Sequence, residues 1–391
     1  MNRRKFLKRA GYLGGGLAAA DLDRLATAAS SPKPGASVSG TVGTEAEKIR
    51  VGLITEPGGQ HLSAFTKALG ILDGVEMVAA ADPSGDFLPK GRGLLGARAS
   101  SYRTFSDYKQ MLQEIKPQLA LLALEPHHTP PVMEAVLQAG GHILADKPAC
   151  VRLADFERVV RLAQSKRLQV MLGLTNRVSR PAKRARELVE SGLLGKLYGT
   201  SVHLVADQTR LTKPAYWKTW MASQERAGGG KLIYHGLHYL DLVHYIAGKQ
   251  ISEVTGFTRN VGEQPVEVED SAVLAFRLGD GAVGTLNTGY YLNRGYSTLV
   301  AVWGAQGWLR FDLAAGPPMT WASTHPDAPK GVQSYHYEVE LDTYHVMIEE
   351  AVNAARGLAA PPITSEESLS VLKVVFAAYQ AAAKGTTQEV S

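Results

Sequence analysis

A regular alternation of apolar runs and helix-spaced segments over residues 49–172 constrains the fold of this chain more than any other feature. Apolar residues at helical spacing, as in Leu62, Phe65, Leu69 and Leu72, separate short, mostly apolar runs. Strands are expected at 49–54, 77–81, 118–124, 142–144 and 169–172, and further helices at 108–115, 131–139 and 153–165. Such alternation requires a parallel sheet with crossover helices. We therefore predict a doubly wound Rossmann domain of the α/β class over residues 49–172.

The second half of the chain has a different pattern. Strand-like runs at 273–278 and 282–288 flank Asp280-Gly281, a dipeptide typical of tight hairpins. A strand is also expected at 197–205, a second hairpin at 298–312, and helices at 181–191, 232–247 and 365–384. We predict an α+β domain over residues 173–391 with a large, open-faced, mainly antiparallel sheet, against which the C-terminal helix packs back.

The N-terminus carries the pattern of an export signal. Arg3-Arg4 opens a basic run, a glycine-rich apolar segment follows over 11–20, and Ala26-Thr27-Ala28 offers a small-residue cleavage site. This pattern resembles a twin-arginine signal. We expect a signal peptide at 1–29, a flexible linker rich in Ser, Gly and Pro at 30–48, and a periplasmic or secreted mature protein. The alternative is an ordinary basic terminus without a signal.

Charge and composition exclude several classes of protein. The chain of 391 residues has a formal net charge of +5. Residues 1–28 hold six basic and two acidic residues, so the remainder carries about +1 and offers no basic patch for nucleic acid. No apolar run is long enough to predict a membrane span. Cys150 is the only cysteine, which rules out an intrachain disulfide, and we expect no metal centre.

The first predicted strand leads into a turn suited to a dinucleotide. Gly58 and Gly59 precede the first helix, where glycines let the backbone approach a pyrophosphate and the helix supplies N–H groups. Asp82 ends the second strand, the position of an acid that binds a ribose 2′-hydroxyl and repels a 2′-phosphate. The pattern favours NAD over NADP, although Asp82-Pro83 is also compatible with a plain turn.

Two further stretches carry candidate catalytic residues. Lys147 follows a short strand, at the sheet edge where ligands of open parallel sheets bind, although most lysines are simply solvated. The stretch after Gly228-Gly229-Gly230 puts Tyr234, His238, Asp241 and Tyr245 on one face of a helix. A polar stripe on an apolar helix indicates a site, whereas a single histidine there is more often a core residue.

These stretches together resemble the Gfo/Idh/MocA oxidoreductases, the group of glucose–fructose oxidoreductase and inositol dehydrogenase. The resemblance rests on GGHILADKPA, RVSRPAKRARELVESGLLGKLYG, GGGKLIYHGLHYLDL and the closing PPITSEESLSVLKVVFAAYQAAAKG, and extends from about residue 49 to the end. It implies that Lys147 hydrogen-bonds the reacting hydroxyl and that His238 is the acid–base group. Tyr234 stands where the family often has an aspartate, and a full G-x-G-x-x-G is absent.

The resemblance also implies binding residues and partners. The expected cofactor-binding residues are Gly58, Gly59, Gln60, His61, Asp82, Pro126, His127, Asp146, Lys147 and Asn176, and the expected substrate-binding residues are Arg177, Trp217, His235 and Asp241. A carbohydrate is the expected substrate, and a homo-oligomer formed through the open sheet face is the expected assembly.

Three functions fit the sequence. The first is an NAD-dependent oxidoreductase that acts on a secondary hydroxyl of a sugar or cyclitol and recycles a tightly bound cofactor in each turnover. The second is an NAD-dependent glycoside hydrolase that oxidises the sugar transiently and eliminates the aglycone, for which Tyr234 is a candidate. The third is a non-catalytic nucleotide- or sugar-binding protein, which the presence of both Lys147 and His238 disfavours.

Overall fold

The computed structural model describes residues 47–338 and 343–391. The predicted signal peptide and all but the last two residues of the predicted linker lie outside these residues. Within the described ranges, none of the helices combines the length and apolar character needed to cross a membrane.

The first half of the described chain forms a six-stranded sheet in the order β3-β2-β1-β4-β5-β6, with every pair of neighbours parallel. Its strands are β1 (Ile49–Thr55), β2 (Val75–Ala81), β3 (Arg103–Phe105), β4 (Leu119–Ala123), β5 (His142–Ala145) and β6 (Val170–Leu172). This order confirms the predicted Rossmann fold. The short strand β3 is the one strand of this sheet that the hydrophobic pattern missed, because two of its three residues are exposed.

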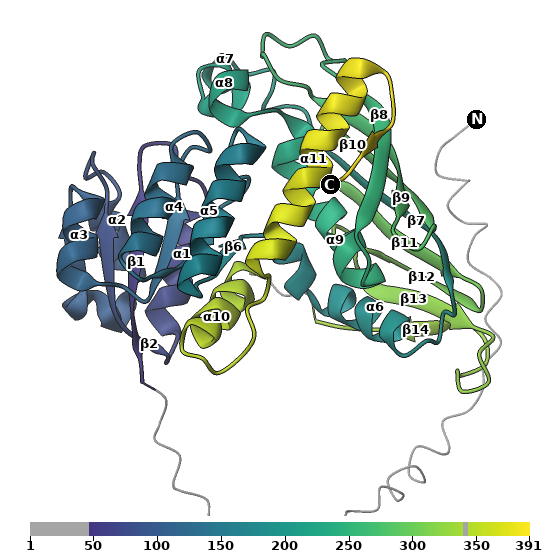
Figure 1. Cartoon of the computed structure of the whole chain (residues 1–391), viewed down its shortest axis with the longest axis horizontal. Helices are drawn as coiled ribbons and strands as arrows, with labels where there is room; N and C mark the ends of the chain where they lie inside the picture. Colours follow the sequence, from purple (N-terminus) through teal and green to yellow (C-terminus); the bar gives the residue numbers. More distant parts are fainter. Residues whose placement is uncertain (1–46, 339–342) are drawn as a thin grey trace, which may run out of the picture. The chain divides into compact units, whose positions relative to one another are not determined.

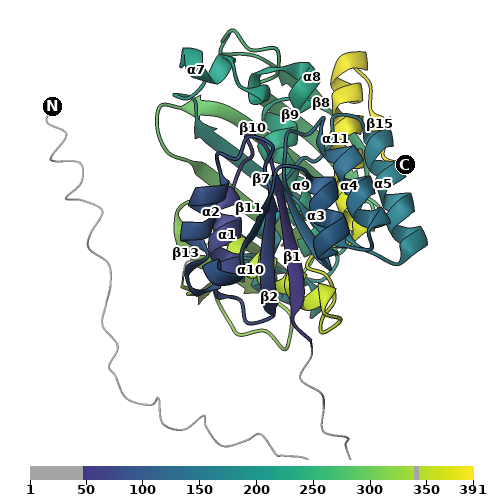
Figure 2. The same cartoon turned by 90° about the vertical axis from the view of Figure 1, so that its left-hand side faces the viewer.

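Helices cover both faces of this sheet. They are α1 (Leu62–Ile71), α2 (Leu88–Leu94), α3 (Tyr108–Ile115), α4 (Thr129–Gln138) and α5 (Leu153–Lys166). Figure 2 shows α1 and α2 on one side of β1 and β2, with α3 and α4 on the other. All five residues of β4 are buried, as expected for a central strand covered on both faces. The strand order reverses between β1 and β4, so a crevice opens beyond their carboxyl ends.

A nine-stranded sheet follows, in the order β14-β13-β12-β11-β7-β10-β9-β8-β15. Its strands are β7 (Leu197–Asp207), β8 (Ile251–Arg259), β9 (Ser271–Leu278), β10 (Val283–Leu292), β11 (Ser297–Gly304), β12 (Gly307–Asp312), β13 (Gly316–Ser323), β14 (Gln333–Tyr335) and β15 (Gln388–Glu389). All neighbours are antiparallel except β7 and β10, which pair in parallel at the centre. The predicted α+β class with a large, mainly antiparallel sheet is confirmed.

One face of the large sheet packs on helices α6 (Arg180–Glu190) and α9 (Leu237–Ala247), as Figure 1 shows. The other face exposes apolar side chains in alternation with the buried ones. Phe257, Val273, Val283 and Trp303 are 80%, 48%, 54% and 45% exposed. Their registers place them on the same face, because Phe257 pairs with Val273, and both Val283 and Trp303 pair with Gly199.

The C-terminal helix α11 (Ser365–Lys384) joins the two sheets (Figure 1). At its start, Ser365 Oγ accepts a hydrogen bond from Val170 N at 2.8 Å, and Ser368 Oγ accepts one from Leu172 N at 3.2 Å. These hydroxyls satisfy N–H groups of β6, the edge strand of the parallel sheet. Farther along, α11 packs on α9 and β8 of the second half. The helix thus fixes the second half against the carboxyl ends of the parallel strands.

Candidate active site

A cavity of about 610 Å³ lies where the two halves meet. Loops after β1, β5 and β6 contribute one wall, and the start of α9 and the rim of β7 and β11 contribute the other. Its lining residues are Gln60, His61, Lys147, Thr175, Asn176, Leu204, Arg210, Tyr234, His235, His238, Tyr239, Tyr296, Thr298, Leu313, Ala314 and Tyr344. The predicted residues Gln60, His61, Lys147, Asn176, Tyr234, His235 and His238 therefore meet in one cavity.

Lys147 is delivered to the cavity by the end of β5 and is only 5% exposed. Its Nζ donates a hydrogen bond to the Tyr234 carbonyl at 2.7 Å and lies 3.5 Å from the centre of the Tyr234 ring. Burial lowers the pKa of Lys147 to about 8, an effect that the charge of Asp146 opposes and that of Arg210 reinforces. The ammonium is thus easier to deprotonate than an ordinary lysine even before a cationic ligand approaches.

The opposite wall carries His235 and His238. His238 is 9% exposed, and its Nδ1 is buried without a hydrogen-bond partner among the described residues. Burial, followed by the charges of Lys147 and His61, lowers the pKa of His238 well below its usual value. The imidazole is therefore neutral at pH 7 and free to accept a proton. His235 Nδ1 lies 3.1 Å from the Tyr290 hydroxyl.

Tyr234 enters the cavity from a π-helical turn, Leu232–Gly236, that precedes α9. The predicted helix over 232–247 therefore begins with a wider turn, a feature that is frequent at functional sites. Burial raises the pKa of Tyr234 well above its usual value. Its hydroxyl is therefore a hydrogen-bond donor at neutral pH and not a base.

A second polar group borders the cavity on the side of the nucleotide domain. His61 Nδ1 lies 2.8 Å from Asp146 Oδ2, and the His61 ring stacks on Tyr344 with centroids 4.6 Å apart. Asp146 also accepts from its neighbour's backbone, Lys147 N, at 3.0 Å. His61 and Asp146, each predicted to bind the cofactor, thus contact each other directly beside Lys147.

The turn after β1 suits a pyrophosphate even without the full glycine motif. Gly58 has φ +93°, which side chains disfavour, and a Cβ at Gly59 would lie 2.3 Å from the Ala123 carbonyl. Both positions therefore require glycine. Helix α1 starts immediately afterwards, and the N–H groups of its first turn have no acceptor within the helix. These N–H groups and the helix dipole would hold the phosphates of NAD.

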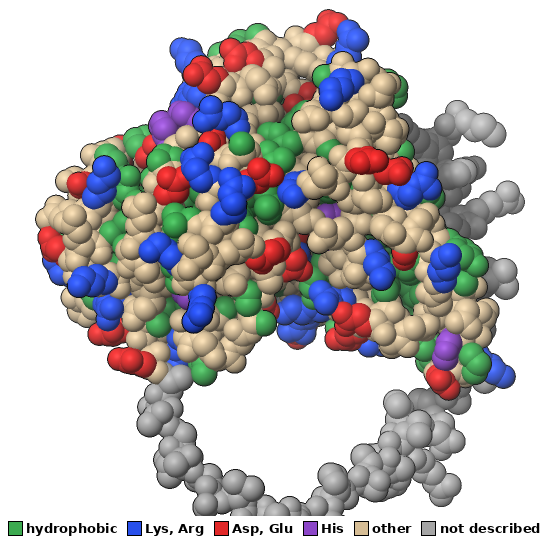
Figure 3. All heavy atoms as spheres, in the orientation of Figure 1, with side chains coloured by type: hydrophobic (Ala, Val, Ile, Leu, Met, Phe, Trp, Pro, Cys, Tyr) green, Lys and Arg blue, Asp and Glu red, His purple; other side chains and the backbone are tan. Residues whose placement is uncertain are grey.

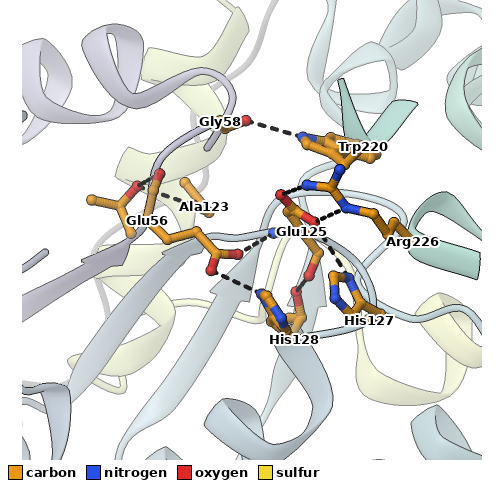
Figure 4. A network of polar contacts seen from close by, with 10 residues as sticks. Glu56, Gly58, Ala123, Glu125, His127, His128, Trp220 and Arg226 are labelled. Atoms are coloured by element: carbon orange, nitrogen blue, oxygen red, sulfur yellow. Dashed lines mark hydrogen bonds and ion pairs between the residues drawn. The ribbon is translucent and has the colours of Figure 1, made fainter. Parts of the chain in front are cut away.

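A charged network closes the nearby crevice between β1 and β4 (Figure 4). Glu56 accepts from Glu125 N at 2.8 Å and lies 2.8 Å from His128 Nδ1. Glu125 forms an ion pair with Arg226, and His127 Nδ1 lies 3.5 Å from the same carboxylate. Glu125, His127 and His128 bring ligand-type atoms within 4.8 Å of one another, but Arg226 occupies the Glu125 carboxylate. The predicted cofactor residue His127, which follows Pro126, is part of this network.

Asp82 lies at the end of β2, as predicted, but its carboxylate is already engaged. It accepts hydrogen bonds from Ser84 N, Ser84 Oγ and Phe87 N, at 3.0, 2.8 and 2.9 Å. The residue is 2% exposed. A ribose hydroxyl would have to share this carboxylate with the groups of Ser84 and Phe87 that already bind it. The role of Asp82 therefore stays a prediction.

The structure places three predicted substrate-binding residues away from the cavity. Arg177 and Asp241 are 2% and 1% exposed and bind each other through two hydrogen bonds, of 3.0 and 2.6 Å. Arg177 also donates to the Pro362 carbonyl, so the pair anchors the start of the C-terminal segment. Trp217 Nε1 donates to the Leu211 carbonyl at 2.6 Å and does not line the cavity.

The predicted polar stripe on the 232–247 helix is therefore divided. Tyr234 and His238 face the cavity, whereas Asp241 and Tyr245 face Arg177, whose guanidinium lies 5.1 Å from the Tyr245 ring centre. Helical spacing shows that residues share a face but not that one neighbour covers the whole face. The π-helical turn also changes the angular offset between Tyr234 and the residues of α9.

Several cavity residues escaped the sequence analysis. Arg210 and Tyr296 come from two separate connections, and Tyr344 lies in the first turn of helix α10 (Thr343–Ala355). None of the three carries a local motif. Trp220 was also missed; it does not line the cavity, but its Nε1 donates to the Gly58 carbonyl at 3.1 Å, beside the nucleotide turn (Figure 4). Lys231, directly after the glycine triplet, is fully buried beside Tyr290. The triplet itself was a usable signal for Lys231, whereas only the fold brings the others to the site.

Comparison with known proteins identifies both halves of the chain. Residues 51–174 match the oxidoreductase family with an NAD-binding Rossmann fold, and residues 182–310 match the GFO/IDH/MocA C-terminal domain. Myo-inositol 2-dehydrogenase of Thermotoga maritima is 20% identical over 79% of this chain and 90% of its own length. The rhizopine catabolism protein MocA of Rhizobium meliloti is 24% identical over 85% of this chain and 94% of its own length.

Solved structures agree with this assignment at the level of the fold. Levoglucosan dehydrogenase in complex with NADH and L-sorbose superposes with a TM-score of 0.77 at 18% identity, over 88% of this chain and 99% of that one. The matched families cover both the nucleotide half and the sheet half that enclose the cavity. The chain therefore belongs to the Gfo/Idh/MocA family of oxidoreductases and binds NAD through its Rossmann domain.

Proposed function

We propose that this protein oxidises a secondary hydroxyl of a sugar or cyclitol with NAD as hydride acceptor. The observation that carries the proposal is the convergence of Lys147 and His238 on one cavity beyond the carboxyl ends of the parallel strands. The names of the relatives, an inositol dehydrogenase and a levoglucosan dehydrogenase, support polyhydroxylated substrates. Thr175, Asn176 and Thr298 add neutral hydrogen-bonding groups to the cavity, as recognition of hydroxyl groups needs.

Lys147 and His238 have different roles in the proposed reaction. In its ammonium form, Lys147 donates a hydrogen bond to the reacting hydroxyl and stabilises the negative charge that develops on its oxygen. His238, neutral at pH 7, accepts the hydroxyl proton. A bound nicotinamide would supply the hydride acceptor for the carbon that carries this hydroxyl. Tyr234 holds Lys147 in place through its backbone carbonyl and offers its hydroxyl as a donor to the substrate.

We also propose that the protein is exported with its cofactor bound. The arginine pair at residues 3 and 4 supports export in the folded state, and free NAD is not expected outside the cytoplasm. A retained cofactor must be returned to its starting state within each cycle. Reduction of a second substrate does this, and so does transient oxidation during cleavage of a glycoside. Tyr234, which replaces the usual aspartate, favours the second route as an alternative.

One experiment tests these proposals together. Protein purified from the periplasm is denatured, and the released ligand is identified by mass spectrometry, with NAD(H) as the expected result. The intact protein is then screened with free sugars, cyclitols and aryl glycosides for reduction of the bound cofactor and for release of the aglycone. Finding NADP alone would contradict the assignment of NAD, and finding no reduction with any polyol would contradict the oxidoreductase. Replacing Arg3 and Arg4 by lysine should leave the precursor in the cytoplasm.

Tyr234→Phe separates the two routes. If the Tyr234 hydroxyl protonates a leaving group, aglycone release collapses while slow reduction of bound NAD by a free sugar survives. If it only positions His238 and Lys147, both activities fall together and modestly. Unchanged aglycone release in the Tyr234→Phe variant excludes the hydrolase route through this residue.

A further inference from the structure

The ionic groups that line the cavity are of one sign. Lys147 and Arg210 line it, and no aspartate or glutamate is among its described lining residues. Burial lowers the pKa values of His235 and His238, which also line it, so these two histidines are neutral at pH 7. Asp146, next to Lys147 in the chain, is already paired with His61 at 2.8 Å. Asp207 interacts electrostatically with Arg210 and Arg294, but it does not line the cavity, and its carboxylate accepts a hydrogen bond from Thr209 N at 2.7 Å. A neutral sugar does not need such an excess of positive charge.

Arg210 is the cation of this cavity without an assigned role. It follows β7 and donates one hydrogen bond, from a terminal nitrogen to the Tyr290 hydroxyl. Its Nε is buried without a hydrogen-bond partner among the described residues. The rings of Tyr216, Tyr234 and Tyr290 surround the guanidinium, with centroids 5.8, 5.8 and 4.6 Å away. Aromatic faces are only a weak counter-charge for a desolvated cation.

Lys231 adds a buried amine without a hydrogen-bond partner among the described residues, beside the same tyrosine. It is 0% exposed, and its Nζ has no hydrogen-bond partner in the described part of the chain. The Nζ lies 4.2 Å from the centre of the Tyr290 ring, the ring that Arg210 also contacts. The enclosed cavity beside it has a volume of about 10 Å³ and is also lined by Glu269 and Asp270. Both carboxylates are engaged elsewhere, Glu269 by Gly230 N, Leu232 N and the Tyr379 hydroxyl, and Asp270 by Val261 N, Gly262 N and the Ser271 hydroxyl. Burying a lysine without a partner is costly, and packing alone would be served by methionine or leucine.

The charge of Arg210 affects the protonation of Lys231. Burial, and then the charges of Arg210 and Lys147, lower the pKa of Lys231 to about 6. The lysine is thus mostly neutral at pH 7 while the cavity is empty. An anion on the exposed side of Arg210 would reverse this balance, because it favours the protonated form of Lys231.

We propose that Arg210, supported by Lys231 behind the Tyr290 ring, forms an anion subsite and that the substrate is a sugar carrying a carboxylate, such as a uronic acid or its glycoside. The proposal rests on the proposed function for the reaction and adds the substrate class. A carboxylate matches the planar guanidinium in shape, and its single negative charge balances the single positive charge of Arg210. Lys147 and His238, farther along the same cavity, would then face a hydroxyl of the sugar ring.

Binding measurements on the protein with its cofactor bound test the subsite. Methyl β-D-glucuronoside and methyl β-D-glucoside differ only by a carboxylate in place of a hydroxymethyl group. We expect the glucuronoside to bind about 10- to 100-fold more tightly by calorimetry, the scale of hydrogen bonds to a charged group. Binding at pH 7 should be accompanied by proton uptake, measured as a dependence of the heat on the buffer.

Variants distinguish a specific carboxylate site at Arg210 from a nonspecific effect of nearby positive charge. Arg210→Gln should abolish the preference for the carboxylate, and Lys231→Met should reduce it and remove the proton uptake. Lys213→Met, which removes an exposed cation from the same connection, should leave both unchanged. Equal affinities of the two glycosides in the wild type overturn the proposal, as does an unchanged preference in Arg210→Gln. If Arg210 only braces the tyrosines, its replacement weakens both glycosides equally.

The remaining outcomes distinguish the subsite from the reaction. Glucuronate, galacturonate and mannuronate widen the panel, and failure of all of them to bind overturns the proposal. Tighter binding of glucose 6-phosphate than of any uronate contradicts the choice of a carboxylate. A carboxylate preference without reduction of bound NAD supports the subsite and contradicts the proposed oxidation. Oxidation of neutral sugars without tighter binding of the carboxylate sugars supports the proposed oxidation and contradicts the subsite.

Discussion

At pH 7, Lys147 is mainly an ammonium ion and His238 is neutral. These two protonation states predict how the rate of NAD reduction depends on pH. The pKa of Lys147 is about 8, so its ammonium form is lost as the pH rises through 8. His238 has a pKa well below its usual value and stays neutral throughout this range. We expect single-turnover reduction of bound NAD to be constant between pH 6.5 and about 7.5 and to fall above pH 8.

Rapid-mixing absorbance at 340 nm checks this profile. Lys147→Met and His238→Ala should each reduce the rate by about 10²-fold or more at pH 7, the usual scale for a positioned acid–base group. The falling limb near pH 8 should be absent from Lys147→Met. A rate that rises through pH 8 in the wild type would show that the neutral amine is the active form. Both variants should still bind NAD, since neither side chain contributes to the turn at Gly58 and Gly59.

Lys231 carries a stability prediction of its own. Its pKa is lowered to about 6 in the folded protein, against an ordinary value of 10.5, so the unfolded chain binds more protons between these pH values. The contribution of Lys231 to the free energy of unfolding should therefore rise as the pH rises from about 6 to 10.5. Lys231→Met removes the cost of discharging the amine and should stabilise the apoprotein at pH 7 by about 2–4 kcal/mol.

Denaturant unfolding at pH 7 and at pH 9.5 measures this effect. The gain from Lys231→Met should be smaller at pH 9.5, because less free energy is then needed to deprotonate the lysine. Lys213→Met, on the surface, should change the free energy of unfolding by less than about 0.5 kcal/mol. Destabilisation by Lys231→Met at both pH values would show that the ammonium is paired in the folded protein.

At the scale of elements, the connection between β7 and α9 lies over the nucleotide turn. Trp220 belongs to a 3-10 turn, Trp220–Ala222, and Arg226 to the short helix α8, Gln224–Ala227. Trp220 binds the Gly58 carbonyl near the end of β1, and Arg226 pairs with Glu125 near the end of β4 (Figure 4). A bound dinucleotide would have to pass this connection in order to leave.

Breaking both contacts should therefore release the cofactor. We expect the double variant Trp220→Ala, Arg226→Ala to raise the dissociation rate of NADH by about 10-fold or more, since each contact contributes roughly 1 kcal/mol. Loss of NADH fluorescence after dilution gives the rate. Arg184→Ala, which breaks an exposed ion pair with Glu187 in α6, is the matched control. Equal rates in wild type and double variant would mean that the connection does not retain the cofactor.

At the scale of the whole molecule, the uncovered face of the large sheet predicts self-association. Phe257 and Val273 form one exposed apolar pair on this face, and Val283 and Trp303, which both pair with Gly199, form a second. Exposed apolar groups of this kind favour an interaction site. On the face that Figure 3 shows, acidic and basic side chains are interspersed, so charge does not separate one end of that view from the other. Homo-oligomers with self-complementary interfaces are the commonest assembly.

Light scattering after size-exclusion chromatography tests this prediction. We expect an oligomer for the wild type and a monomer for Phe257→Asp with Trp303→Asp, whose charges cannot be buried against a second copy. Tyr198→Asp, at another exposed aromatic, is a control for general effects of charge. A monomeric wild type at micromolar concentration would contradict the prediction.

The sequence by itself determined the Rossmann half and the place of Lys147 at the end of one of its strands. Buried parallel strands are continuous apolar runs, and crossover helices have their own spacing, so both can be recognised locally. The position of Lys147 after β5 follows from the strand alone, because ligands bind beyond the carboxyl ends of such strands. Only the family resemblance singled out His238 from its neighbours.

The tertiary structure decided which polar residues meet. Arg177 and Asp241 are 64 positions apart, and their pairing removes both from the substrate cavity. Arg210 reaches that cavity from a connection and Tyr344 from the start of helix α10, and neither carries a motif. Lys231 is buried nearby, beside Tyr290, without an ion-pair partner among the described residues. A local pattern records which way a side chain points relative to its own helix or strand. It does not record which distant element covers that side, and this covering element decides whether a polar group pairs, binds a ligand or stays free.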